Sequence, residues 1–467
     1  MKLNKIILPA LMFSLLLCAC KKYLELKPDK KLYVPTSLAD CQALLDDYNT
    51  MNEQAYPGDG EVASDHYYVT DATYLSLVNN DERDNYIWST QANHAVSSWS
   101  RPYKVVFNAN LVLQVLENVN PKIGEEYDRV KGSALFFRGY ALYSLASIYC
   151  KPHDETSSGN DLGVPVRLSP DIDQIYGRGT VQQTYQQIIQ DLKSAADLLP
   201  NGSSIKSRPN KQAAYAALAR VYLAMRDYTN AGIYADLSLK INKNLLNFYT
   251  LSTTATLPFS RFNDEVIFAS SLFSFSILSQ TNAKITKSPL YPLYDSYQSD
   301  DLRKQLFFRS NTGANANTFA FKGSYQNSAS NLFNGLATDE MYLIRAECYA
   351  RGGRTIEALK DLNDLLKTRW QVNKDASGNV ISTKYVNYTA SSPNEALAII
   401  LKEREKELIF RGIRWTDLRR LNKESFAVTI SRTVNGITYS LPPNDLRYTL
   451  LIPQDVIINT GVPQNSR

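Results

Sequence analysis

The stretch LARVYLAMRDYTNAGIYADLS, residues 218–238, carries the pattern that decides the fold. An apolar segment with small residues ends near Asp227, and a second segment of the same kind follows. Small side chains such as Ala219, Ala231 and Ala235 let two helices approach closely, while Tyr222 fills the groove between neighbouring pairs. The stretch therefore predicts a tetratricopeptide-like pair of helices joined by a short turn.

The same spacing returns in IRAECYARGGRTIEALKDLNDL, residues 344–365. Tyr222, Ala231, Ala235 and Ser238 follow Ala219 at fixed intervals. At the same intervals after Ala346 stand Tyr349, Ala358, Leu362 and Leu365. Ala146 and Tyr149 begin a third unit, whose return helix is 181–199 after a long insertion through 151–180. We therefore expect a mainly α fold in which helix pairs form the scaffold and carry no chemistry.

Further elements follow from periodicity and end signals. Apolar residues recur at helical spacing over 108–119 and 133–149. Ser392, Pro393 and Glu395 form the pattern of a capping box, with proline at the first helical position, so a helix begins there. The Asn435-Gly436 turn precedes a short strand over 437–441.

The N-terminus has the pattern of an export signal. Lys2 and Lys5 precede an apolar run that is shorter than the roughly 20 residues a membrane-spanning helix needs. Leu17-Cys18-Ala19-Cys20 then resembles a lipobox, which predicts a lipoprotein signal peptide over 1–19 and lipidation of Cys20. The alternative is an ordinary secretory signal with incidental cysteines. Acyl chains on Cys20 would anchor the protein to a membrane without a spanning helix.

The composition excludes several classes of function. A net charge of +5 over 467 residues is too small to indicate nucleic-acid binding. The remaining cysteines, Cys41, Cys150 and Cys348, are too far apart for a zinc site, and we expect buried free thiols, with one pair involving Cys41 as the alternative. The chain has 30 tyrosines but 3 histidines, and it lacks GxSxG, Walker and GxGxxG motifs. We therefore expect a binding protein, not an enzyme, with no cofactor and no metal.

Two aromatic, polar stretches, 55–103 and 251–325, have the composition of long ordered loops, where binding residues usually lie. Trp88 stands in the polar segment NYIWS, which favours an exposed ring that stacks on a ligand. Tyr67, Tyr86, Tyr291 and Asp81 are further candidates. The alternative for these aromatic side chains is packing in the core, and we assign Trp99, Tyr103, Tyr222, Trp370 and Trp415 to the core.

Charged residues near the C-terminus have helical spacing, so we predict structural ion pairs and not an acid–base site. The residues concerned are Glu403, Glu407, Arg414 and Asp417. Arg138, far from them in the sequence, is added as the hypothetical buried partner of Asp417 across helices. The loop carboxylates Asp65, Asp71, Asp81 and Asp84 lack EF-hand spacing, so a structural Ca²⁺ is the alternative to simple solvation.

An ordered set of motifs runs along the chain: CKKYLELKP (20–28), WSRPY (99–103) with NAN (108–110), ALFFRGY (134–140) with LGVP (162–165), AAYAALARVYL (213–223), DDLR (300–303), EREKEL (403–408) with GIRWTDLRR (412–420), and LIPQ (451–454). This set resembles the SusD/RagB family of outer-membrane nutrient-binding lipoproteins. Gly139 stands where the family usually has alanine, and Arg411 where it usually has an acidic residue. The resemblance covers essentially the whole chain after Cys20.

The resemblance implies a SusD-like fold with four tetratricopeptide-like pairs supporting a loop-rich ligand face. It implies a body over 20–467, with the first pairs in 20–240, a loop-rich part over 241–335 and a C-terminal part over 336–467. It also implies a lipid anchor in the outer membrane, facing outward, and a SusC-like TonB-dependent transporter that the protein covers as a lid. The ligand implied is an oligosaccharide, or a peptide on the same scaffold. Against a lipoprotein hydrolase stand the missing nucleophile motifs, and against a purely structural adaptor stand the long aromatic loops.

Overall fold

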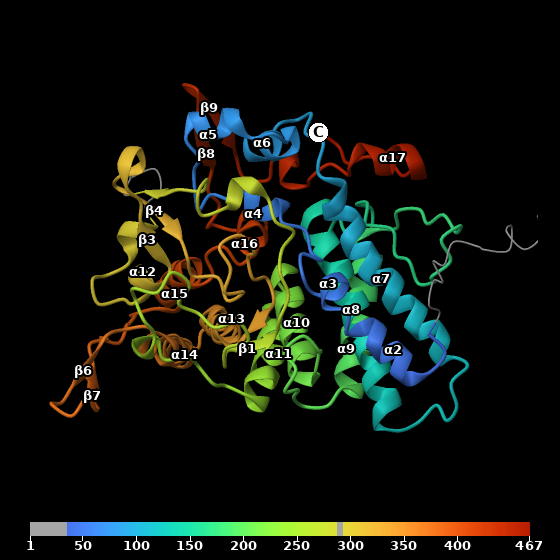
Figure 1. Ribbon diagram of the computed structural model, residues 1–467, viewed down its shortest axis with the longest axis horizontal. Coiled ribbons are helices and arrows are strands. Elements are labelled where there is room, and N and C mark those ends of the chain that lie inside the picture. The colour runs from blue at the N-terminus through green and yellow to red at the C-terminus, as the bar shows by residue number, and fades with distance from the viewer. Residues whose placement is uncertain (1–34, 287–292) are drawn as a thin grey trace, which may run out of the picture. The chain divides into compact units, whose positions relative to one another are not determined.

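The computed structural model describes residues 35–286 and 293–467 (Figure 1). Predictions on the signal peptide 1–19, Cys20 and Tyr291 lie outside these residues. The residues Ser37–Arg467 form the unit described below. It is mainly helical, as the sequence predicted. None of its described helices combines the length and the apolar character needed to cross a membrane.

The predicted helix pairs are present. α10 (Lys211–Ala224) packs on α11 (Tyr228–Ile241), α13 (Thr338–Arg351) packs on α14 (Thr355–Lys367), and α8 (Glu125–Tyr149) packs on α9 (Val181–Leu198). The small residues Ala219, Ala231 and Ala346 are fully buried where the helices meet. α11 also packs against α13, so the pairs stack side by side in Figure 1. The repeat spacing therefore correctly predicted the helix pairs of the central scaffold.

Two predicted helices begin earlier than their apolar pattern. α7 spans Val96–Leu116 and contains Pro102 near its start, where the lost backbone hydrogen bond is offset by burial of Trp99 and Val105. α8 begins with Glu125 and Glu126, and acidic residues in a first turn interact favourably with the helix dipole. Polar starts of this kind are invisible to a search for apolar periodicity.

The helix predicted near Ser392 is α15 (Pro393–Glu407). The Ser392 hydroxyl accepts from Glu395 N at 3.2 Å, as expected of the N-cap. The reciprocal contact of the predicted capping box is shifted by one residue, because the Glu395 carboxylate accepts from the backbone N and the hydroxyl of Ser391 at 2.7 and 2.6 Å. The capping is therefore real, although it uses two serines.

Shorter elements surround the pairs. The other helices are α2 (Leu38–Leu45), α3 (Tyr48–Met51), α4 (Asp59–Ala63), α5 (Asp71–Ser76), α6 (Asn80–Tyr86), α12 (Arg303–Leu306), α16 (Arg414–Leu421) and α17 (Gln454–Thr460). The strands are β1 (Val266–Phe268), β2 (Ile285–Thr286), β3 (Phe308–Ser310), β4 (Thr318–Phe321), β5 (Leu336–Ala337), β6 (Val372–Lys374), β7 (Val380–Thr383), β8 (Ile430–Val434) and β9 (Ile437–Leu441). They form small antiparallel sheets, β1-β5, β2-β4-β3, β6-β7 and β8-β9, and β9 is the predicted strand.

The described residues contain two hydrophobic clusters. One joins the helix pairs to α2, α7 and α16, and the other fills the aromatic region around β2, β3 and β4. Cys41 and Cys150 are buried free thiols and Cys348 is a half-buried free thiol, so the alternative of a disulfide is wrong for these three.

Each of the predicted ion-pair residues does form an ion pair, but the predicted partnership of Arg138 and Asp417 is wrong. Arg138 binds Asp191 through two hydrogen bonds of 2.7 and 2.6 Å. Asp417 instead accepts from Arg404 at 2.9 Å and from Arg420 at 2.8 Å. Spacing along one helix shows which residues share a face, but it does not identify the helix that packs against that face.

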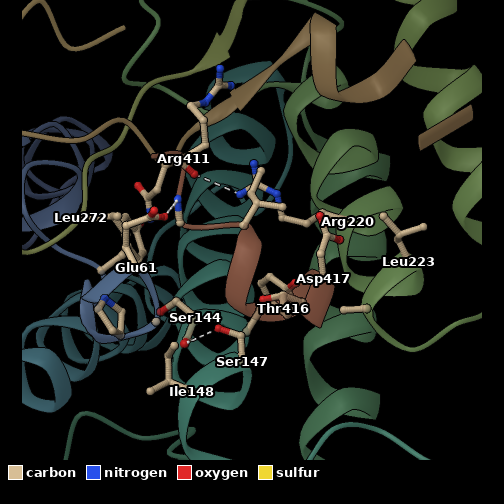
Figure 2. Close-up of a pocket in the computed structure, with 18 of the residues that line it drawn as sticks. Glu61, Ser144, Ser147, Ile148, Arg220, Leu223, Leu272, Arg411, Thr416 and Asp417 are labelled. Atoms are coloured by element: carbon tan, nitrogen blue, oxygen red, sulfur yellow. Dashed lines mark hydrogen bonds between the residues drawn. The ribbon is translucent and has the colours of Figure 1, made fainter. Parts of the chain in front are cut away.

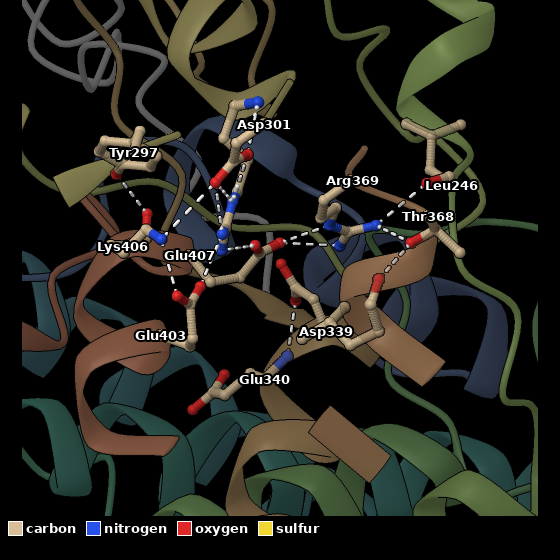
Figure 3. A network of polar contacts seen from close by, with 12 residues as sticks. Leu246, Tyr297, Asp301, Asp339, Glu340, Thr368, Arg369, Glu403, Lys406 and Glu407 are labelled. Atoms are coloured by element: carbon tan, nitrogen blue, oxygen red, sulfur yellow. Dashed lines mark hydrogen bonds and ion pairs between the residues drawn. The ribbon is translucent and has the colours of Figure 1, made fainter. Parts of the chain in front are cut away.

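The partners of the other three also come from distant segments. Glu403 and Glu407 bind Arg303 of α12 at 2.6 and 3.0 Å. Arg414 binds Asp65 at 2.7 Å. Figure 3 shows how Asp301, Glu403, Lys406, Glu407 and Arg369 converge in this interior. The predicted ion pairs therefore belong to a network between elements.

We expect acid to destabilise the fold partly through Asp417. Burial raises the pKa of this carboxyl, but Arg404 and Arg420 outweigh burial and lower the pKa to about 2. The unfolded value is near 3.9, so this stabilisation is present above about pH 4 and is lost as the pH falls toward 2. Asp417→Asn should therefore lower the urea midpoint at pH 7 and reduce the loss of stability between pH 5 and 3. The exposed Asp47→Asn is the matched control, and an unchanged acid dependence in Asp417→Asn would contradict the assignment.

Candidate functional site

A surface groove lies between α7, the segment 165–176 and α17, and it has the size of a small-molecule site. Its volume is about 390 Å³, within the roughly 300–1,000 Å³ typical of ligand pockets. The residues that line it are Trp99, Ser100, Tyr103, Val106, Phe107, Asn110, Pro165, Arg167, Ser169, Ile172, Gln174, Ile175, Tyr176, Val456, Asn459, Thr460 and Val462. We call this site the α7 groove.

The floor of the α7 groove is an aromatic stripe on α7. Trp99, Tyr103 and Phe107 recur every fourth residue, so they lie on one face of the helix. The rings of Trp99 and Tyr103 are in contact, with centroids 5.1 Å apart. Trp99 is almost completely buried, whereas Tyr103 and Phe107 are half-buried. The stripe therefore gives the groove a rigid apolar surface.

Hydrogen bonds hold the wall formed by residues 165–176 against this floor. The Tyr103 hydroxyl donates to Pro165 O at 2.8 Å. The Asn110 amide donates to Arg167 O at 3.0 Å, and its own oxygen accepts from Arg138 at 3.0 Å. Burial raises the pKa of Tyr103, so its hydroxyl stays protonated and keeps donating. The Arg138–Asp191 pair thus positions the groove wall through Asn110.

The rim of the α7 groove combines a cation with exposed apolar side chains. The Arg167 guanidinium lies over the Tyr176 ring at 5.1 Å and donates to Asp171 O at 2.8 Å. Ile172 and Ile175 are 75% and 77% exposed. Histidine, cysteine and acidic residues are absent from the lining of the groove. This set suits stacking and hydrogen bonding to a neutral ligand more than proton transfer.

A second cavity, inside the protein, is too small for a sugar. It lies between α4, α8, α10 and α16, and its volume is about 50 Å³. Glu61, Arg220, Arg411 and Asp417 are among the residues that line it (Figure 2). A water needs roughly 10–15 Å³ by such a measure, so this volume holds a few waters that can solvate buried charges. The cavity therefore belongs to the polar interior.

The aromatic residues that the sequence suggested as ligand platforms are not exposed. Trp88, Tyr86 and Tyr67 are 4%, 1% and 0% exposed. Their rings surround the guanidinium of Arg432 at 4.7, 3.9 and 5.3 Å. The expectation of an exposed Trp88 is therefore wrong, because the polar segment around it folds inward to contact a buried arginine. The alternative of core packing is the correct one for these three rings.

The remaining candidates have local roles. Asp81 lies half-buried in α6, where its carboxylate accepts from Glu82 N at 2.9 Å. Burial raises the pKa of Asp81. Asp65, one of the possible Ca²⁺ ligands, is bound to Arg414. Within residues 35–286 and 293–467, no group of three or more His, Cys, Asp or Glu side chains is arranged to hold a metal.

Sequence reasoning missed the α7 groove. Trp99 and Tyr103 were assigned to the core, which holds for Trp99, but both residues also line the groove. Tyr176 and Arg167 lie in the insertion of 151–180, which the sequence pattern marks only as an interruption of a helix pair. The available signal was the aromatic stripe at positions 99, 103 and 107 next to a long insertion, since long loops often carry binding sites.

Two family models match the chain. One, described as "Starch-binding associating with outer membrane", matches residues 22–223, and the other, described as "SusD family", matches residues 268–448. Together they span most of the sequence. No curated protein matches the chain significantly in sequence.

Solved structures share the fold at low identity. A SusD superfamily protein from Bacteroides thetaiotaomicron VPI-5482 has a TM-score of 0.73 and 23% identity, covering 92% of this chain and 100% of its own. A SusD-like carbohydrate binding protein from Bacteroides vulgatus ATCC 8482 has a TM-score of 0.68 and 20% identity, covering 91% and 97%. A surface glycan-binding protein A from Bacteroides uniformis has a TM-score of 0.69 and 17% identity, covering 92% and 99%.

The family models and the fold therefore agree with the motifs found in the sequence, from WSRPY at 99–103 to LIPQ at 451–454. The expectation of a mainly helical SusD-like fold is confirmed, and the chain belongs to the SusD/RagB family, one of whose models is described as associating with the outer membrane.

Proposed function

We propose that the protein captures oligosaccharides at the outer membrane and binds them in the α7 groove. The observation that carries the proposal is the groove itself, which places an aromatic floor beside amide, hydroxyl and guanidinium groups. A sugar ring has an apolar C–H face and a polar edge, so stacking on Tyr176 or Tyr103 and hydrogen bonds from Arg167, Asn459 or Gln174 would bind it. The names of the two related Bacteroides proteins support a carbohydrate ligand.

The proposal includes the membrane context expected from the sequence. Cys20 carries the lipid anchor on the outer face of the outer membrane, and a SusC-like TonB-dependent transporter receives the ligand while this protein acts as its lid. The protein catalyses no reaction. Membership of the SusD/RagB family and the lipobox support this arrangement.

Tyr176→Ala should weaken oligosaccharide binding about fivefold to tenfold, because aromatic stacking of this kind contributes about 1 kcal/mol. Calorimetry against plant, host and microbial oligosaccharides first identifies a ligand, and the variant is then titrated with it. Tyr249→Ala, a half-buried tyrosine that does not line the groove, is the control. Equal affinities of Tyr176→Ala and the unmodified protein would place the ligand elsewhere.

The groove also favours a second candidate, a peptide ligand on the same scaffold. Ile172 and Ile175 project from the rim with most of their surface exposed, and such side chains suit apolar peptide residues better than hydroxyl groups. The screen therefore includes mixed peptides. Peptide binding without sugar binding would replace the first proposal by the second.

A further inference from the structure

Residues 251–263 form a loop that presents an unusual exposed pair, Arg261 and Phe262. Both side chains are exposed, and Phe262 is 42% accessible. Phe262 has φ +63°, in the left-handed region that a bulky side chain seldom adopts. Backbone strain of this kind persists where the surrounding structure enforces it, and it concentrates at binding sites. The left-handed backbone at Phe262 therefore makes this loop a candidate binding site.

Hydrogen bonds and aromatic packing hold this loop against the rest of the protein. The buried Lys322 ammonium donates to Thr253 O and Ala255 O at 2.8 and 2.9 Å. The Asn327 amide donates to Phe259 O at 2.7 Å. Phe259 is fully buried and its ring lies 5.0 Å from that of Tyr325. These contacts fix the loop, so Arg261 and Phe262 are presented by a rigid support.

The Arg261 guanidinium is held by two aromatic rings. It lies 4.4 Å from the ring centroid of Tyr48, at the start of α3, and 4.7 Å from that of Phe262. These rings are the contacts that the described part of the chain provides for it, and its hydrogen-bond donors are not engaged by a carboxylate there. Stacking on rings restrains a guanidinium in a plane and leaves its N–H fork available along the edge.

We propose that Tyr48, Arg261 and Phe262 form a second binding site, which takes the carboxylate of an acidic sugar unit such as a uronic acid. The fork of Arg261 would bind the carboxylate through two parallel hydrogen bonds, the geometry in which arginine binds carboxylates most strongly. The exposed face of Phe262 would stack on the C–H face of the same sugar ring. None of these residues lines the α7 groove, so the site is additional to the function proposed above.

The choice of an acidic sugar over an acidic peptide follows from this pairing. An acidic side chain of a peptide needs only the cation, which other exposed arginines such as Arg309 also offer. A uronic acid joins its carboxylate directly to a ring, so it uses the cation and the adjacent aromatic face together.

The test is calorimetric titration of the purified protein with a galacturonic acid tetramer at fixed ionic strength. Comparison ligands are the methyl ester of the tetramer, a neutral glucose tetramer and a tetraglutamate peptide. The unmodified protein should bind the acid at least about tenfold more tightly than its ester, because the ester loses the charge-assisted hydrogen bonds. The peptide should bind weakly.

Variants separate the fork from simple charge. Arg261→Gln should lower affinity for the acid at least about tenfold, and Arg261→Lys should recover little because lysine lacks the planar fork. Phe262→Ala should lower affinity severalfold. Arg309→Gln, which removes an exposed arginine on β3, should leave this affinity unchanged.

The proposal is overturned if the acid does not bind, if Arg261→Gln binds it normally, or if Arg309→Gln loses as much affinity as Arg261→Gln. Tetraglutamate binding as tight as the sugar acid would overturn the choice of ligand. Failure of the α7 groove to bind any sugar would leave these outcomes unaffected.

Discussion

Replacing Arg303 by methionine should lower the free energy of unfolding by about 3–5 kcal/mol, since this removes one partner from a buried ion network. Arg303 is completely buried. It donates to Asp301 at 2.7 Å, to Glu403 at 2.6 Å and to Glu407 at 3.0 Å. Without the guanidinium these carboxylates remain buried in the polar network of Figure 3, with less positive charge to balance them. Buried charges without partners are costly because they cannot recover their hydration.

The measurement for Arg303→Met is urea unfolding followed by circular dichroism. Lys384→Met is a suitable control, because Lys384 binds Asp300 at 3.0 Å and the two side chains are 38% and 41% exposed. Exposed pairs contribute at most about 1 kcal/mol, so the control should unfold near the midpoint of the unmodified protein. Similar midpoints for the two variants would mean that the network relaxes or admits water, contrary to our expectation.

Arg432→Met is expected to have the second large effect, about 3 kcal/mol, through a different mechanism. Arg432 is 2% exposed, and its guanidinium donates to the backbone oxygens of Tyr86, Val62 and Ser64. Methionine would fill much of the space inside the aromatic cage but would leave the backbone oxygens of Tyr86 and Ser64 without donors, whereas Val62 O would keep the Tyr67 hydroxyl at 2.8 Å. Each unsatisfied buried oxygen costs about 1–3 kcal/mol, and loss of the buried charge offsets part of the total.

The same unfolding experiment tests Arg432→Met against Ser431→Ala, an exposed neighbour on β8. The control should stay within about 0.5 kcal/mol of the unmodified protein. Tryptophan fluorescence adds a local readout, because Trp88 contacts Arg432 and its indole donates to Ala63 O at 2.9 Å. An unchanged midpoint together with unchanged fluorescence would show that the cage does not need its cation.

The scaffold was predictable because its information is local. The spacing from Ala219 to Ser238 describes helices that are neighbours in sequence and that pack on each other directly, and Ser392 caps the helix that follows it. The partners of buried charges were not predictable. Arg138 could be expected to form an ion pair, but only the structure shows that its partner is Asp191 of α9 and not Asp417.

The residues of a candidate binding site were harder still to predict. Trp88 lies in a polar segment, and its burial depends on Arg432, which comes from a strand 346 positions beyond Tyr86. No local pattern around Trp88 reveals such a contact. The α7 groove likewise needs α7, an insertion and the last helix together, and a pattern within any one of them describes only a part of the wall.

The position of the α7 groove also suggests how ligand specificity could change between related proteins. Its floor belongs to a helix of the scaffold, but its two outer walls are residues 165–176 and α17, and these lie outside the packed helix pairs. If the groove binds the ligand as proposed, substitutions in those walls would alter ligand selection without disturbing the repeats that hold the protein together. Related proteins could therefore keep the helix pairs and differ in residues 165–176 and α17 when they bind different ligands. The same two segments are the ones to exchange in order to engineer another ligand specificity.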